Sequence, residues 1–268
     1  MRWPRPLEWS GLAVIAGGLV FAAVLPLLRR QAPAVQPESV GFPLGPSTPF
    51  DPKVIVPTDA RGAGAGTAFS IDSRGVWLTA RHVVEGCRRV VVVTGQGRGV
   101  AARARLDPAS ESALLFTSGG APALPVATAL DLRRGDIAYH PGFPKGRPGE
   151  IASRLLRRET LVLRRRSEPV LAWAEVGHSP FLWGSLAGLS GAPALNRAGE
   201  VMAVTVAQAP RRRRVYTTTP ASMIAFLRAA GATPDPAAAK VAPNDSYHQV
   251  ADRLRRDLSV AQVICLND

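Results

Sequence analysis

A serine lies in a run of small residues that favours a tight turn, Gly188-Leu189-Ser190-Gly191-Ala192-Pro193. A hydroxyl exposed on such a turn could serve as a nucleophile. Gly188 lets the chain turn so that its own amide and that of Ser190 aim at one position, as an oxyanion hole requires. Taken alone, the segment is also typical of a loop serine between two strands. An α/β-hydrolase elbow needs a helix after the serine, whereas an apolar strand is predicted here.

A histidine closes the second segment of interest. Gly66-Thr67-Ala68-Phe69-Ser70-Ile71 is followed by Trp77-Leu78-Thr79-Ala80-Arg81-His82-Val83-Val84, a pattern typical of two strands that end at His82. The chain has four histidines, so one histidine near a motif is by itself more often structural than catalytic.

Together, and in this order, the segments resemble the trypsin-like peptidases of the chymotrypsin fold, most closely the bacterial high-temperature-requirement (Deg) group. That group shows a Gly-Thr/Ser-Gly/Ala-Phe strand, Leu-Thr-Ala-x-His, Asp-x-x-x-Asp-Leu-Ala-Leu-Leu and Gly-x-Ser-Gly-Gly-Pro. The matching segments here are Gly66–Phe69, Leu78–His82, Asp107–Leu115 and Gly188–Pro193, and Gly142-Phe143-Pro144 resembles a Gly-Tyr/Phe-Pro segment that lies between the last two. The resemblance implies two Greek-key β-barrels and serine endopeptidase activity.

The resemblance also implies a role for each matching residue. Ser190 would be the nucleophile, His82 the general base, and the amides of Gly188 and Ser190 the oxyanion hole. The substrate pocket would have its wall at Val204, Thr205, Val206 and Ala207 and its base near residues 184–187. Neither stretch holds an acidic residue, so small or medium apolar side chains are the expected substrate preference.

Glu111 departs from the family pattern, because the family has aspartate where this chain has glutamate. A glutamate can still accept the imidazole N–H, but its extra methylene requires an adjustment of about 1 Å, and misplacement on that scale can cost about 10²-fold in rate. Asp107 matches a different family position and is a weak substitute. Three interpretations stay open: a working Ser190–His82–Glu111 triad, a slow enzyme, and a pseudopeptidase that keeps the fold for binding peptides or proteins.

The elements that must position these residues are predicted to be strands. Gly (25) and Pro (24) are abundant and aromatic residues make up only 6%, a mixture that suits many short strands better than a helical bundle. Ten apolar runs separated by turn residues indicate an all-β fold: 54–56, 67–71, 76–79, 90–93, 113–116, 137–139, 161–163, 169–172, 192–195 and 201–207. A helix is expected at about Ala221–Ala230, begun by Thr219-Pro220.

An uncharged stretch of 20 residues, Trp9–Leu28, is long enough to cross a bilayer as a helix. We expect an uncleaved anchor in residues 1–30, since a signal peptide usually has a shorter apolar region; a cleaved signal is the alternative, and a buried core helix a third. A Pro-rich linker would follow at 31–50 and the peptidase domain at 51–231. The expected location is the bacterial inner membrane with the domain in the periplasm, or the periplasm itself after signal cleavage.

Residues 232–268 are interpreted as a C-terminal helical appendage, with a helix at Tyr247–Leu258 and a short apolar end at Val260–Leu266. The remaining length, about 37 residues, is about half of what the PDZ module common in the Deg group needs. Two cysteines, Cys87 and Cys265, are too few for a cysteine-rich zinc site or a disulfide-dense scaffold. They could form one disulfide or remain two buried thiols, and no metal or other cofactor is expected.

The net charge of +13 raises the question of an anionic partner. The arginines are scattered apart from Arg164–Arg166 and Arg211–Arg214, and no aromatic residues interleave with those runs as base stacking would require. We expect them on solvated loops and strand edges. The predicted partners are therefore a peptide or protein substrate and the membrane, not nucleic acid, and the sequence does not indicate the oligomeric state.

Overall fold

The computed structural model describes residues 41–55, 64–95, 97–163, 166–180, 182, 185–239 and 246–267. The predicted anchor at 1–30 and the first half of the predicted linker lie outside these residues. Within the described ranges, no helix is both long enough and apolar enough to cross a membrane.

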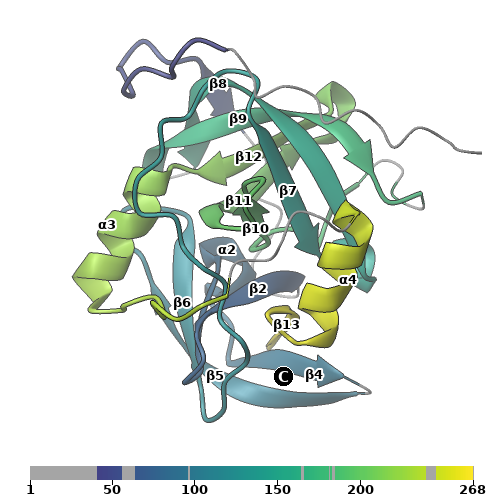
Figure 1. Cartoon of the computed structure of the whole chain (residues 1–268). Helices are drawn as coiled ribbons and strands as arrows, with labels where there is room; N and C mark the ends of the chain where they lie inside the picture. The colour runs from purple at the N-terminus through teal and green to yellow at the C-terminus, as the bar shows by residue number, and fades with distance from the viewer. Residues whose placement is uncertain are drawn as a thin grey trace, which may run out of the picture. The chain divides into compact units, whose positions relative to one another are not determined.

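Six antiparallel strands close into a first barrel, in the order β13-β2-β3-β6-β5-β4 (Figure 1). Their bounds are Ala65–Asp72 (β2), Val76–Ala80 (β3), Arg89–Gly95 (β4), Arg98–Leu106 (β5), Ser112–Thr117 (β6) and Val260–Leu266 (β13). Large apolar side chains such as Phe69, Leu78 and Leu114 are fully buried, and their burial supplies the main free energy that holds the barrel together.

A second barrel forms from β8-β7-β10-β11-β12-β9, and it closes because β9 pairs back with β8. Its strands are Ile137–Gly142 (β7), Gly149–Leu163 (β8), Arg166–His178 (β9), Pro193–Leu195 (β10), Val201–Ala209 (β11) and Arg214–Thr218 (β12), and a short strand, Lys53–Ile55 (β1), lies parallel to β8 outside the ring. The all-β prediction with two barrels is confirmed.

Three helices and two 3-10 turns complete the described elements: Arg81–Val84 (α2), Pro220–Ala230 (α3), Tyr247–Arg256 (α4), Pro144–Gly146 (η1) and Pro210–Arg212 (η2). The helix predicted at 221–230 is α3, and Thr219 caps it by accepting from the Ser222 amide. The helix predicted at Tyr247–Leu258 is α4, which contacts β7, β8 and β13 and so touches both barrels (Figure 1).

The prediction that the chain ends in an appendage is wrong for Val260–Leu266. This segment is β13, which pairs with β2 on one side and with β4 on the other. Without it the first barrel would be open between β2 and β4, and their edges would present unpaired backbone groups. A disulfide between Cys87 and Cys265 fastens β13 to the segment that follows α2.

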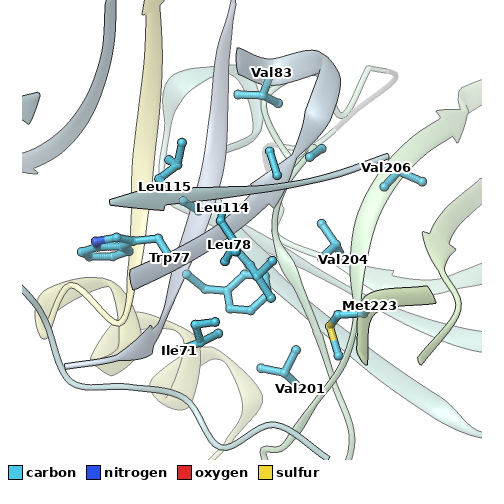
Figure 2. Packing of buried hydrophobic residues seen from close by; sticks show 14 of the residues in the cluster. Ile71, Trp77, Leu78, Val83, Leu114, Leu115, Val201, Val204, Val206 and Met223 are labelled. Carbon is cyan, nitrogen blue, oxygen red and sulfur yellow. The ribbon is translucent and has the colours of Figure 1, made fainter. Parts of the chain in front are cut away.

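One buried apolar cluster runs through both barrels. It joins Leu78 and Leu114 of the first barrel to Val204 of β11 and Met223 of α3, as Figure 2 shows at close range. Because cores are packed as densely as organic crystals, this shared cluster holds the facing ends of the two barrels in a fixed arrangement.

Candidate active site

His82 stands at the end of the strand that the sequence predicted. β3 ends at Ala80, and α2 carries His82 between Arg81 and the buried residues Val83 and Val84. The Arg81 amide donates to the Glu111 carbonyl at 3.0 Å. The His82 side chain is 36% exposed. One edge of the ring is therefore accessible while the backbone is held by the barrel.

Glu111 supplies the acid that contacts this histidine. Its Oε2 lies 2.8 Å from Nδ1 of His82 and also accepts from the His82 amide at 3.3 Å. The carboxylate is 3% exposed. Burial raises the pKa of Glu111, but the hydrogen bonds and charge of His82 and the charge of Arg166 lower it more, so the pKa lies below its usual value. Glu111 is thus held as an anion against the imidazole.

Asp107 has a different task. Its Oδ1 accepts from the Ala109 amide at 3.0 Å and its Oδ2 accepts from the Ser110 hydroxyl at 2.5 Å. Both bonds are local and fix the turn that leads into Glu111. Among the described residues no hydrogen bond joins Asp107 to His82.

Ser190 lies on a tight turn between Gly188 and Gly191, whose φ angles are +95° and +88°. Such angles favour glycine. The Gly191 amide donates to the Thr205 carbonyl at 2.7 Å, and the Leu189 amide donates to the Leu186 carbonyl at 2.9 Å. In contrast, the amides of Gly188 and Ser190 donate to no acceptor within the described part of the chain. The turn therefore leaves two donors free on alternate residues.

The turn packs directly on the strands that carry His82. The Thr67 amide of β2 donates to the Ser190 carbonyl at 2.8 Å, and its hydroxyl donates to the Gly188 carbonyl at 2.8 Å. A Cβ at Gly191 would lie 1.9 Å from the Thr67 carbonyl oxygen and 3.0 Å from the amide of Ala80. The serine turn of the second barrel thus packs against Ala80, which precedes His82 by two positions in the first barrel.

The described residues show no hydrogen bond between the Ser190 hydroxyl and the His82 ring. Catalytic hydrogen bonds are often long in structures without substrate and tighten only when substrate binds.

The residues predicted to form the pocket wall lie on β11. Val204, Thr205 and Val206 are buried, and Ala207 is half-buried. The Thr205 hydroxyl lies 2.9 Å from Nδ1 of His140, a fully buried histidine whose pKa is lowered to about 3 by burial. His140 is therefore neutral and supports the strand behind the serine turn.

The next residue of β11, Gln208, was not predicted from the sequence to belong to the site. Its Oε1 accepts from the Leu186 amide at 2.7 Å, and its Nε2 donates to the Ser185 hydroxyl at 3.4 Å. These bonds join β11 to the segment predicted as the pocket base, of which Gly184 lies outside the described residues. Gln208 stands one position beyond the predicted wall, and its polarity within an apolar strand was the available signal.

Arg166 and Glu168 were also missed, and both contact the acid. Arg166 Nη2 pairs with Oε1 of Glu111, and its Nη1 donates to the Ser110 carbonyl at 3.2 Å. Glu168 Oε1 accepts from the Glu111 amide at 2.9 Å. The prediction that the Arg164–Arg166 run is solvated is wrong for Arg166, whose side chain is only 24% exposed.

Glu168 is expected to make the stability of the fold depend on pH. Burial, together with the nearby charges of Glu111 and Asp107, raises the pKa of Glu168 to about 7, against the lowering effects of the Glu111 amide and Arg166. Its other oxygen is buried without a partner in the described structure. Between pH 4.5 and about 7 the folded state keeps a proton that the unfolded state has released, so stability falls as pH rises through this window.

Glu168→Gln removes this titration. The stability of the variant relative to wild type is expected to rise from pH 4 to pH 8, by on the order of 3 kcal/mol at most. Urea unfolding at a series of pH values measures this difference. Gln249→Ala, at an exposed side chain that does not titrate, is the control and should give a flat difference. A flat difference for Glu168→Gln as well would contradict the raised pKa.

Comparison with known proteins agrees with this geometry. A family model described as "Trypsin-like peptidase domain" matches residues 66–204, just over half of the chain. The HhoA protein of Synechocystis sp., which bears a serine-protease name, is 30% identical over 163 residues, covering 57% of this chain and 39% of HhoA. The chain therefore spans about two fifths of that relative.

Solved structures share the fold. The Rv3671c protease of M. tuberculosis superimposes with a TM-score of 0.53 at 22% identity, covering 64% of this chain and 87% of that one. The HtrA-type protease AlgW gives a TM-score of 0.52 at 17% identity, covering 61% of this chain and 50% of that one. At these identities the likeness concerns the fold.

Proposed function

Because the chain belongs to the family of trypsin-like peptidase domains, we propose that it is a serine endopeptidase in which Ser190, His82 and Glu111 form the catalytic triad. The observation that carries the proposal is the 2.8 Å contact between His82 Nδ1 and the buried Glu111 carboxylate. The contact supports a tautomer in which Nδ1 keeps its hydrogen and donates it to Glu111. It leaves Nε2 as the proton acceptor.

In the proposed reaction, Ser190 Oγ attacks the carbonyl carbon of the scissile peptide bond, and its proton passes to Nε2 of His82. Glu111 stabilises the imidazolium that forms. The amides of Gly188 and Ser190 donate to the oxyanion of the tetrahedral intermediate. His82 then gives its proton to the leaving amine, and water attacks the acyl-enzyme in a second cycle of the same transfers.

The contact between Glu111 and His82 favours a working triad over a pseudopeptidase. The concern raised by the sequence was that the longer side chain would misplace the carboxylate. With Oε2 at 2.8 Å from Nδ1, no further adjustment of about 1 Å is needed. For the substrate we propose peptides with small or medium apolar side chains at the cleavage site, since the described residues around Gln208 and Leu186 offer no acidic group to pair with Arg or Lys.

A fluorophosphonate probe tests the proposal, because it reacts with a serine only when the base and oxyanion hole activate that serine. Wild type is expected to be labelled, and Ser190→Ala is expected to remain unlabelled. Ser73→Ala, at an exposed serine in the β2–β3 turn, is the matched control and should be labelled like wild type. Equal, slow labelling of wild type and Ser190→Ala would instead support the pseudopeptidase.

The proposed location is the periplasmic side of a bacterial inner membrane, with residues 1–30 as the anchor. Its support is the uncharged run Trp9–Leu28 and the Cys87–Cys265 disulfide, because disulfides persist mainly in oxidising compartments.

A further inference from the structure

Glu111 has two carboxylate oxygens, and only one of them faces His82. Oε2 accepts from both Nδ1 and the amide of His82. If Oε1 had no donor, the flexible glutamate side chain could rotate and take Oε2 away from the ring. A carboxylate buried to 3% exposure also needs compensation for its lost hydration. The site therefore requires a second donor on the far side of Glu111.

Arg166 is that donor. It lies at the start of β9, pairs with Oε1 of Glu111, and reaches the Ser110 carbonyl with its other terminal nitrogen. A guanidinium presents its donors in a rigid planar fork, so the two bonds fix the carboxylate relative to the backbone that precedes it. Arg81, which is also near Glu111, donates instead to Glu85 and to the Asp107 carbonyl.

The strand geometry adds a third contact from the same face. Residues two apart on a strand point to the same side, and Glu168, two residues after Arg166, accepts from the Glu111 amide at 2.9 Å. The second barrel thus contacts the first at the Ser110 carbonyl, the Glu111 amide and the Glu111 side chain. Glu168 and Asp107 also bring two further carboxyl groups near Glu111, and the Arg166 charge offsets them.

We propose that Arg166 is a positioning residue for the catalytic histidine, acting through Glu111. Within the described structure its side-chain nitrogens bond to Glu111 and Ser110 and to no atom of His82 or Ser190. It holds the longer acid of this chain in the place where the family uses aspartate, so that Oε2 stays on Nδ1 of His82. The inference rests on the proposed triad for its catalytic consequence, and on the contacts of Arg166 with Glu111 and Ser110 for its structural one.

Arg166→Gln is expected to lower kcat for an apolar peptide substrate by about 10- to 100-fold with KM changed by less than about twofold, because misplacing a catalytic group by about 1 Å costs rate on that scale. Arg166→Lys keeps the charge without the fork and should recover part of the loss. Arg157→Gln is the matched control: it removes an arginine of the same hairpin that is half exposed and paired with Glu159, and it should turn over like wild type.

A second measurement needs no catalysis. The carboxyl ¹³C resonance of Glu111, followed by NMR against pH, should show a higher pKa in Arg166→Gln than in wild type and a nearly unchanged one in Arg166→Lys. The low-field NMR signal of the proton in the His82–Glu111 hydrogen bond should lose intensity only in Arg166→Gln. If kcat, the Glu111 titration and this proton are all unchanged in Arg166→Gln, the positioning role is overturned. If wild type has no peptidase activity but these NMR changes occur, the proposed function fails while the hold on Glu111 stands.

Discussion

Glu111→Gln is expected to lower kcat by about 10⁴-fold. The amide that replaces the carboxylate is nearly isosteric, but it cannot stabilise the imidazolium, and it can hold the histidine in the tautomer whose Nε2 carries a hydrogen. An equivalent aspartate-to-asparagine change in a serine protease has a cost of this size. Arg166 would also face a neutral group, so the contact at Oε1 of Glu111 loses most of its strength. Steady-state kinetics with a chromogenic peptide measures the effect.

Glu111→Asp separates the charge of the carboxylate from its reach. Aspartate keeps the charge but is one methylene shorter, so its carboxylate would lie nearer the backbone of residue 111 and away from the position that Glu111 Oε2 occupies, 2.8 Å from Nδ1 of His82. We expect activity within about 10²-fold of wild type, since a displacement of about 1 Å has that cost, and well above that of Glu111→Gln. Equal activity of the Gln and Asp variants would remove Glu111 from the triad.

The strands that carry the motifs were predictable because each is a short run of mostly apolar residues. β2, β3 and β6 have buried residues on both faces, so hydrophobicity alone marks them. β5 was missed for the opposite reason. Its sequence, Arg98–Leu106, mixes three arginines with small residues, and from Gly99 to Arg105 every second residue is exposed, so no long apolar run signals it.

The role of β13 could not be predicted, because it depends on pairing with two strands that are far from it in sequence. Val260–Leu266 pairs with β2 and β4, from which it is separated by more than 160 positions in the sequence. Local patterns identify an apolar segment but do not identify its neighbour. The same limit applies to Arg166, because a run of arginines looks solvated until the fold places a buried carboxylate beside it.

The residues of the site likewise fall into those that local sequence patterns identify and those that only the fold brings together. His82, Glu111 and Ser190 stand in motifs whose residue types suffice to suggest chemistry. Arg166, Glu168 and Gln208 stand in no motif. Arg166 and Glu168 reach from the second barrel to Glu111, and Gln208 joins β11 to Leu186, 22 positions earlier in the chain. Their contributions follow from register and burial, which only the folded chain supplies.

Loss of the Cys87–Cys265 disulfide is expected to lower the free energy of unfolding by about 5 kcal/mol, because it closes a loop of 178 residues and so restricts the unfolded chain strongly. In the folded chain it ties β13, the strand that completes the first barrel, to the segment just after α2. The double variant Cys87→Ala/Cys265→Ala removes the bond without leaving a reactive thiol. Urea unfolding of this variant and of the oxidised wild type measures the difference.

The disulfide also lies close in sequence to His82, five residues before Cys87. Val83 and Val84, between them, are buried in the core, so α2 has anchors besides the disulfide. We therefore expect the double variant to keep most of its turnover at 25 °C while it unfolds at lower urea. A reducing agent should lower the midpoint of wild type to that of the double variant and leave the variant itself unchanged. If reduction lowers the free energy of unfolding of wild type by less than about 1 kcal/mol, packing of β13 between β2 and β4, rather than the covalent link, closes the barrel.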